Sequence, residues 1–289
     1  MKRVAALAAL VAALFALALP AASGAAQSSA PKRIVALTPF AANTLVKLGV
    51  TPVGVGQTLG GETRLSPKLK NVTVLPLSHP NGPNLEQLAS LRPDLVLSSR
   101  TWVKGNQAME NLGIKVINYE PISISRSYRD TYRIGMLVGK KPQARALLKS
   151  MKKGVAAATK GIKSRPKVML LLGVGRTPFT MLPNSWGGDV VTKAGGELLT
   201  GGVNSNSGFV RISDEIVVAE NPDVIIAVPH ANASDIPSLT EYLRANPTWS
   251  GTSAARNGRV YVSVDNSLLQ AGTDVARTIR KVRSAYLKN

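Results

Sequence analysis

One pattern of fifteen residues occurs twice in this chain, beginning at Leu85 and again at Asp214. The first copy reads LEQLASLRPDLVLSS and the second reads DEIVVAENPDVIIAV. In both copies a Glu stands seven residues before the Pro of a Pro-Asp pair, and an apolar run follows. Each copy therefore has the order of a short helix, a turn and a strand. A repeated helix–turn–strand unit predicts two similar lobes with a cleft between them.

Short apolar strands alternate with helices on both sides of the middle of the chain. The predicted strands are 33–37, 52–55, 72–75, 94–98, 115–119, 168–172, 223–228 and 259–262. The predicted helices between them are 41–48, 84–91, 105–112, 188–194, 213–220, 239–243 and 273–287. This alternation is typical of the α/β class, and we expect mainly parallel sheets in both lobes.

The segment from Ser127 to about Lys163 has a different pattern. Apolar residues recur there at helical spacing, and Lys and Arg fill the other faces. Gly139 and Pro142 interrupt the pattern, which predicts two helices in series. The predicted organisation is a signal peptide over 1–26, an N-terminal lobe over 27–125, a connecting helix over 126–164 and a C-terminal lobe over 165–289. A long helical connection is stiff, so we expect the lobes to move little relative to each other.

The first residues have the features of a secretory signal peptide. Lys2 and Arg3 precede an Ala- and Leu-rich run over 4–19, and small residues suited to cleavage follow over 20–26. The chain contains no Cys, which excludes disulfides, thiolate metal sites and a lipid-modified N-terminal cysteine. We therefore expect an exported periplasmic protein without a lipid anchor.

The formal net charge of +20 raises the question of an anionic partner. Aromatic residues make up only 4% of the chain, so no stacking platform for nucleic acid is evident. Together with export, this argues against a nucleic-acid partner. A basic field also attracts an anionic small ligand or an anionic membrane face, and charge alone does not choose between these two.

The two histidines follow strands of different predicted lobes. His79 comes after the strand over 72–75, and His230 after the strand over 223–228. Ligands of open α/β sheets bind outside the carboxyl ends of the strands, so the two imidazoles are expected to share the cleft. Together they suit the two axial positions of a haem iron. For each, a hydrogen-bonded surface histidine is the alternative, and Tyr119 is either a substitute oxygen ligand or a packing residue.

Cationic and aromatic residues on comparable loops complete the predicted haem site. The expected partners of the propionates are Arg100, Lys104 and Arg176. Trp102 and Trp186 are expected to form apolar walls. A ferric siderophore or a corrinoid remains open, because such ligands are held mainly by Trp, Tyr and Arg contacts. A bare divalent metal is disfavoured, because two histidines in separate lobes supply too few ligands.

Several phrases, taken in order, carry a resemblance to a known family. They are RIVAL at 33–37, NLE and RPDLV within 84–96, LGI at 112–114, the long connecting helix, AGG at 194–196, and the second Pro-Asp-strand phrase. The chain resembles substrate-binding proteins of the helical-backbone class, which deliver vitamin B12, ferric siderophores, haem or metal ions to ABC importers. The resemblance covers about residues 33–287.

The resemblance implies roles for particular residues. One surface Glu per lobe docks against arginines of the importer's membrane subunits, and the matching positions are Glu86 and Glu215. The alternative for both is a solvated carboxylate favoured by the helix dipole. The loop over 228–231 resembles that of haem-uptake binding proteins, in which a His ligates iron. The opposite ligand in those proteins is commonly a Met, whereas this chain has His79 in that loop.

An enzyme is the alternative from a different class. The sequence contains no nucleophile elbow, His-Glu-x-x-His phrase or Walker phrase. We therefore predict a non-enzymatic, monomeric binding protein that captures haem in the interlobe cleft and delivers it to the membrane subunits of an ABC importer. A ferric siderophore or cobalamin is the alternative cargo, and a hydrolase is a remote alternative.

Overall fold

The computed structural model describes residues 30–57, 65–231, 233–265 and 267–288. The chain from Pro31 to Asn289 forms one compact unit. The predicted signal peptide over 1–26 lies outside the described residues. None of the helices in the described ranges combines the length and apolar character needed to cross a bilayer.

The first sheet is parallel throughout, with strand order β3-β2-β1-β6-β7. Its strands are β1 (Ile34–Ala36), β2 (Gly54–Gly56), β3 (Thr73–Leu75), β6 (Leu95–Ser98) and β7 (Val116–Asn118). Helices α1 (Pro39–Lys47), α2 (Leu85–Ser90) and α3 (Val103–Asn111) alternate with these strands, and the hairpin of β4 (Leu77–Ser78) and β5 (Gly82–Pro83) follows β3. Because the strands are parallel, their carboxyl ends all meet at one edge.

The second sheet is mixed, with strand order β11-β9-β8-β12-β13 and with β10 paired to β8. Its strands are β8 (Lys167–Val174), β9 (Thr177–Met181), β10 (Glu197–Leu199), β11 (Phe209–Arg211), β12 (Val224–His230) and β13 (Val260–Val262). Strands β10, β12 and β13 run parallel to their partners, whereas β9 is antiparallel to β8 and to β11. Gly175, at a φ of 57°, allows the tight turn from β8 into β9. The predicted α/β class with mainly parallel sheets is confirmed.

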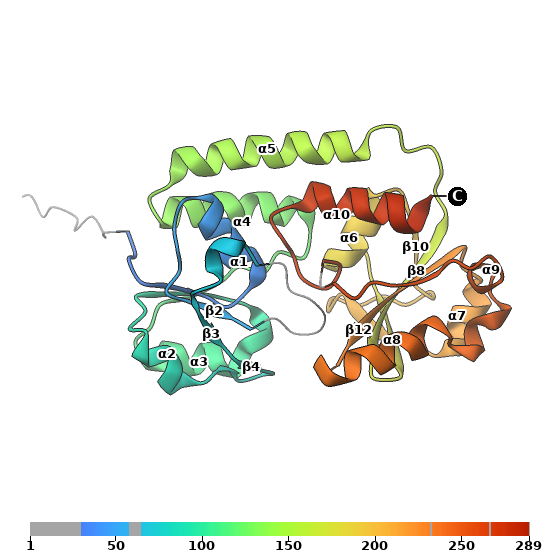
Figure 1. Cartoon of the computed structure of the whole chain (residues 1–289), viewed down its shortest axis with the longest axis horizontal. Coiled ribbons are helices and arrows are strands. Elements are labelled where there is room, and N and C mark those ends of the chain that lie inside the picture. The colour runs from blue at the N-terminus through green and yellow to red at the C-terminus, as the bar shows by residue number, and fades with distance from the viewer. Residues whose placement is uncertain (1–29, 58–64, 232, 266, 289) are drawn as a thin grey trace, which may run out of the picture. The chain divides into compact units, whose positions relative to one another are not determined.

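The remaining helices flank the second sheet or join the two sheets. They are α4 (Ile124–Leu137), α5 (Lys141–Thr159), α6 (Trp186–Lys193), α7 (Asp214–Glu220), α8 (Ile236–Arg244), α9 (Ser253–Arg256) and α10 (Val275–Val282), which continues as a π-helical turn over Arg283–Leu287. Figure 1 shows α4 and α5 antiparallel after the first sheet. Helix α10 returns from the second sheet and packs against α5.

One hydrophobic cluster runs through these joining helices. It includes Ile34 of β1, Ile134 of α4, Val155 of α5, Leu170 of β8 and Ile279 of α10, all of them buried. The connection between the sheets is therefore a packed layer of helices, and a large swing of one sheet against the other would expose this cluster to water.

The two copies of the repeated pattern make the same local contacts. The carboxylate of Asp94 accepts the backbone N–H of Arg33 at 3.0 Å, and that of Asp223 accepts the backbone N–H of Lys167 at 2.9 Å. The backbone N–H of each Asp also donates back to the carbonyl of the same partner. In both lobes the Pro-Asp pair thus ties the turn to the start of the central strand, β1 or β8.

Candidate functional site

His230 is the last residue of β12, at the carboxyl edge of the second sheet. Its ring is partly buried, and within the described residues its buried Nδ1 has no hydrogen-bond partner. Burial lowers the pKa of His230, because a buried imidazole is harder to charge. His230 therefore offers a neutral imidazole, which is the form that ligates metals.

His79 lies in the tight turn between β4 and β5, and it is exposed. The turn rests on the start of α3, where the carbonyl of Pro80 accepts the backbone N–H groups of Lys104 at 3.2 Å and Gly105 at 3.5 Å. The ring centroid of His79 lies 6.4 Å from that of Trp102. These contacts place His79 at the carboxyl edge of the first sheet.

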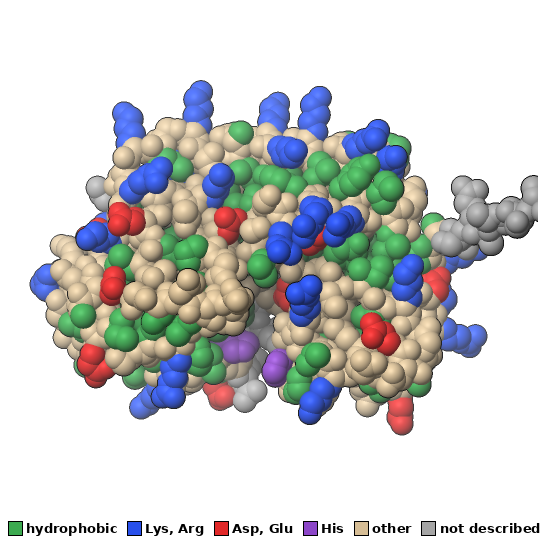
Figure 2. Space-filling model, turned by 180° about the vertical axis from the view of Figure 1, so that it is seen from behind, with side chains coloured by type: hydrophobic (Ala, Val, Ile, Leu, Met, Phe, Trp, Pro, Cys, Tyr) green, Lys and Arg blue, Asp and Glu red, His purple; other side chains and the backbone are tan. Residues whose placement is uncertain are grey.

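Figure 2 shows how the two histidines lie on the molecular surface. The His side chains, coloured purple, appear on the same face and on the two sides of the hollow between the lobes. The sequence predicts this arrangement from the position of each histidine after a strand. Because the chain contains two histidines, both belong to this one surface.

Glu120 lies where the two lobes meet, two residues after the end of β7. Its carboxylate accepts a hydrogen bond from the hydroxyl of Ser99 and another, at 3.5 Å, from that of Thr101. Gln270, from the segment after β13, also bonds to it. Burial raises the pKa of Glu120, and these three hydrogen bonds oppose the rise. The sequence patterns do not predict this residue, although an acid directly after the predicted strand over 115–119 was an available signal for its position.

A cavity of about 320 Å³ lies beside this junction. It is lined from the first lobe by α1 residues such as Pro39 and Asn43, and from the second by Gln270, Asp274 and Arg277. Neither histidine lines it. Gln270 both lines the cavity and bonds to Glu120, so the cavity lies beside this contact and apart from the histidines.

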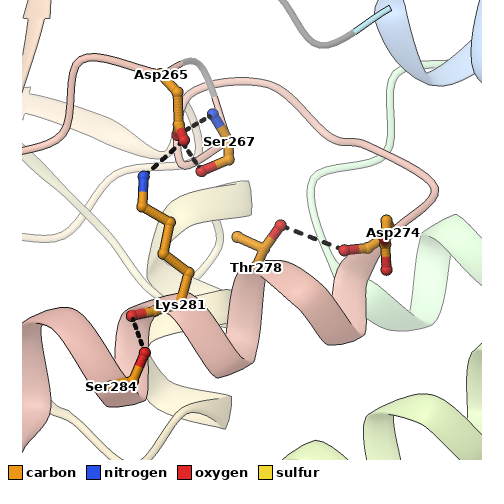
Figure 3. A network of polar contacts seen from close by, with 6 residues as sticks. All are labelled: Asp265, Ser267, Asp274, Thr278, Lys281 and Ser284. Carbon is orange, nitrogen blue, oxygen red and sulfur yellow. Dashed lines mark hydrogen bonds and ion pairs between the residues drawn. The ribbon is translucent and has the colours of Figure 1, made fainter. Parts of the chain in front are cut away.

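The wall of this cavity is fixed by a polar network at α10 (Figure 3). Asp265 accepts a 2.6 Å ion pair from Lys281 and hydrogen bonds from the backbone and hydroxyl of Ser267. Burial opposes ionisation of Asp265, but the bonds from Lys281 and Ser267 hold its pKa below the usual value. Thr278 also donates to the backbone carbonyl of Asp274 at 3.4 Å. The Lys281–Asp265 contact therefore ties Asp265, which follows β13, to α10.

The predicted propionate partners are all exposed and come from both lobes. Arg100 and Lys104 lie at the start of the helical segment after β6. Arg176 lies in the turn after β8, where its guanidinium stacks 4.8 Å from the ring centroid of Tyr242. Val174 of β8 pairs in register with His230, so Arg176 and His230 share one end of the second sheet.

The two predicted tryptophan walls are buried. Trp102 is 2% exposed and lies next to the His79 ring, and no described residue accepts its indole N–H. Trp186 is 4% exposed, and its indole N–H donates to the carbonyl of Ser267 at 2.9 Å. The structure places Trp186 in the core, where the sequence predicts an open wall, because α6 turns its first residue toward β8 and α10. Tyr119, 9% exposed, also packs in the core.

The described residues contain no group of three or more His, Asp or Glu side chains arranged to hold a metal ion. The carboxylate of Asp189 is engaged in a structural hydrogen bond, because it accepts the backbone N–H of Ile124 at 2.7 Å. The described residues therefore place two imidazoles at the hollow and do not form a complete ligand set for a bare metal ion.

The predicted docking residues occupy equivalent positions. Glu86 and Glu215 are each the second residue of a short helix, α2 and α7, behind the N-caps Asn84 and Ser213. Both glutamates are exposed. Hydrogen bonds from the Ser213 side chain and from its own backbone N–H hold the pKa of Glu215 below its usual value. Figure 1 shows α2 and α7 on the side of the molecule away from α5.

Comparisons with known proteins agree with this architecture. The cobalamin-binding protein of Halobacterium salinarum is 29% identical over 265 residues, which cover 89% of this chain and 70% of that protein. The high-affinity heme uptake system protein IsdE of Staphylococcus aureus is 28% identical over 234 residues, which cover 79% of this chain and 78% of that protein. The crystal structure of S. aureus IsdE complexed with heme matches with a TM-score of 0.74 at 25% identity, over 89% of this chain and 99% of that chain.

A family model described as periplasmic binding protein matches residues 34–265. The matched range begins with β1 and ends after β13, so it contains both sheets, the joining helices α4 and α5, and both histidines. The chain therefore belongs to the periplasmic binding protein family.

Proposed function

We propose that this protein captures haem in the hollow between its lobes and delivers it to the membrane subunits of an ABC importer. The observation that carries the proposal is the His230 imidazole, which is neutral, partly buried and without a described partner for Nδ1. His79 lies on the other side of the same hollow. Two imidazoles, one from each lobe, suit the axial positions of a haem iron.

The charges around the hollow support the same cargo. Haem carries two propionates, and Arg100, Lys104 and Arg176 are exposed cations at the carboxyl edges of the two sheets. The haem-uptake relative covers most of this chain, and the relatives are named as binding and uptake proteins, which favours capture over catalysis.

Titration with haemin tests the proposal through the Soret band of the bound iron. We expect His230→Ala to weaken haemin binding by at least about tenfold and to shift the band, because an axial ligand is lost. His79→Ala should shift the band as well. Glu110→Ala, at an exposed position of α3, is the control and should bind as the parent does. A His230→Ala protein with the parental spectrum and affinity would remove His230 from the site.

Cobalamin is a second candidate cargo, favoured by the H. salinarum relative, which matches 89% of this chain. Parallel titrations with haemin, cobalamin and a ferric hydroxamate separate the candidates. If the protein binds cobalamin tightly and does not respond to haemin, cobalamin is the cargo in place of haem, and the proposed transport role is unchanged. Tight binding of the hydroxamate alone would assign the hollow to a siderophore.

A further inference from the structure

A second charged surface lies on α5, outside the hollow. The sequence contains no Asp or Glu between Asp130 and Asp189, although Lys and Arg are frequent there. Six exposed basic residues of this stretch lie on α5 or directly after it: Lys141, Arg145, Lys149, Lys152, Lys153 and Lys160. We call this set the α5 basic stripe.

The spacing of these residues places them on one side of the helix. Four of them are four residues apart, and each such step advances about 40° around an α-helix beyond a full turn. The stripe therefore occupies about a third of the circumference and extends about 28 Å along the axis. The buried residues of α5 lie on the other side: Ala144, Met151, Val155 and Ala158. Figure 2 shows Lys and Arg side chains projecting in a row from this edge of the molecule.

Nothing in the described fold neutralises the stripe. The ion pairs that the described residues form, Arg129–Asp130 and Lys281–Asp265, leave α5 out. Lys152 lies within the stripe, and its ammonium is 5.9 Å from the ring centroid of Tyr128, a contact that leaves its charge in place. Like charges four residues apart repel each other on a helix, so the stripe weakens α5 in the isolated protein. An anionic partner would remove this repulsion.

We propose that the α5 basic stripe docks the protein onto an anionic lipid membrane. This orientation differs from the one in which Glu86 and Glu215 would meet the importer, because α2 and α7 lie on the side of the molecule away from α5. The stripe is straight and lies on a convex helix face, which fits a broad surface better than a compact ligand. Attraction to an anionic leaflet grows with each Lys or Arg near it and decays within a Debye length. The exposed residues beside the charges include small ones such as Ala146, Ser150 and Ala157, and α5 exposes no large apolar side chain that could insert into a bilayer. Binding is therefore electrostatic and sensitive to salt.

Co-sedimentation of the full chain with lipid vesicles tests this proposal. We compare vesicles of phosphatidylcholine alone with vesicles containing about 30% phosphatidylglycerol. The parent should bind the anionic vesicles at least about tenfold better at about 50 mM salt, and this preference should vanish at about 500 mM. Replacing Lys141, Arg145, Lys149 and Lys153 together by Gln should lower binding to anionic vesicles by at least about tenfold. Any contribution of residues 1–29 is the same in both proteins.

The matched control replaces four exposed lysines outside α5 by Gln: Lys68, Lys70, Lys115 and Lys193. It removes the same charge and should keep anionic-vesicle binding within about threefold of the parent. Circular dichroism checks that both variants are folded. Equal losses in the two variants, or parental binding that ignores anionic lipid, would overturn the proposal. The proposal would also be overturned if the stripe variant lost affinity for soluble heparin but bound vesicles normally. The stripe would then bind an anionic polymer and not a lipid surface.

Discussion

At the scale of single residues, His230 makes the folding stability of the protein depend on pH. Burial lowers its pKa, so the folded protein binds a proton there less readily than the unfolded chain does. Stability is therefore lost as the pH falls below about 6.5, the ordinary value for histidine, with a slope of at most about 1.4 kcal/mol per pH unit for one group. We expect His230→Gln to flatten this slope between pH 7.5 and 5 in urea unfolding. An unchanged slope would mean that the imidazole is solvated.

Glu120 has the opposite dependence on pH. Burial raises its pKa, so the folded state holds a proton there more tightly than the unfolded chain, and stability is lost as the pH rises through the folded pKa. Glu120→Gln keeps an acceptor for Ser99 without the charge. It should stabilise the protein at pH 7.5 by about 1 kcal/mol, and the gain should shrink toward pH 4. Glu110→Gln, exposed on α3, is the control. A gain that is constant with pH would contradict this account.

Among single residues, the sequence predicts the positions of the histidines better than the surroundings of the acids and tryptophans. His79 and His230 follow apolar strands, and the parallel order brings strand ends to one edge. The burial of Glu120 depends on Gln270, which lies far along the chain, so no local pattern reveals it. The burial of Trp186 likewise depends on its bond to Ser267.

At the scale of elements, the two helix–turn–strand copies share a left-handed backbone position but place different residue types there. Arg92 and Asn221, each before a Pro-Asp pair, have φ of 43° and 44°. Asn tolerates this left-handed conformation, whereas Arg is strained there. Asn221 also accepts the backbone N–H of Ser253 at 2.7 Å.

Glycine at these two positions should therefore have opposite effects. Arg92→Gly relieves strain and should stabilise the protein by about 0.5 kcal/mol or more. Asn221→Gly loses the bond to Ser253 and should destabilise it by about 1 kcal/mol. The melting temperatures of the two variants test this, and each variant serves as the control of the other. If both melting temperatures shift in the same direction, backbone strain at Arg92 and the bond of Asn221 do not explain the difference between the two positions.

The predicted elements match the structure wherever a periodic apolar run is long enough. Helix 84–91 and strand 94–98 correspond to α2 and β6 within a residue or two. Strands β9, β10 and β11 are missing from the prediction, because they are short and lie in a Gly-rich passage without clear alternation. Antiparallel pairing of β9 follows from the tight turn at Gly175, which the strand pattern alone does not specify.

At the scale of the whole molecule, the proposed delivery to an importer would use two exposed carboxylates outside the hollow. We expect the double variant Glu86→Ala and Glu215→Ala to bind cargo as tightly as the parent and to abolish uptake by cells that carry the importer, because both exposed helix starts lose their charge. The control is Glu110→Ala with Glu241→Ala, which removes two other exposed carboxylates. Normal uptake by the Glu86 and Glu215 variant would exclude the docking role.

The packed layer of α4, α5 and α10 has a consequence for the timing of cargo exchange. A cluster that runs through both sheets resists a hinge step, so entry of a small molecule needs only collision and local side-chain adjustment. In rapid mixing, the observed rate should therefore rise in proportion to cargo concentration as a single exponential. A closing hinge would instead impose a ceiling on that rate. By the same reasoning, spontaneous escape is governed by the bonds to the cargo, and fast unloading requires work done on the protein from outside.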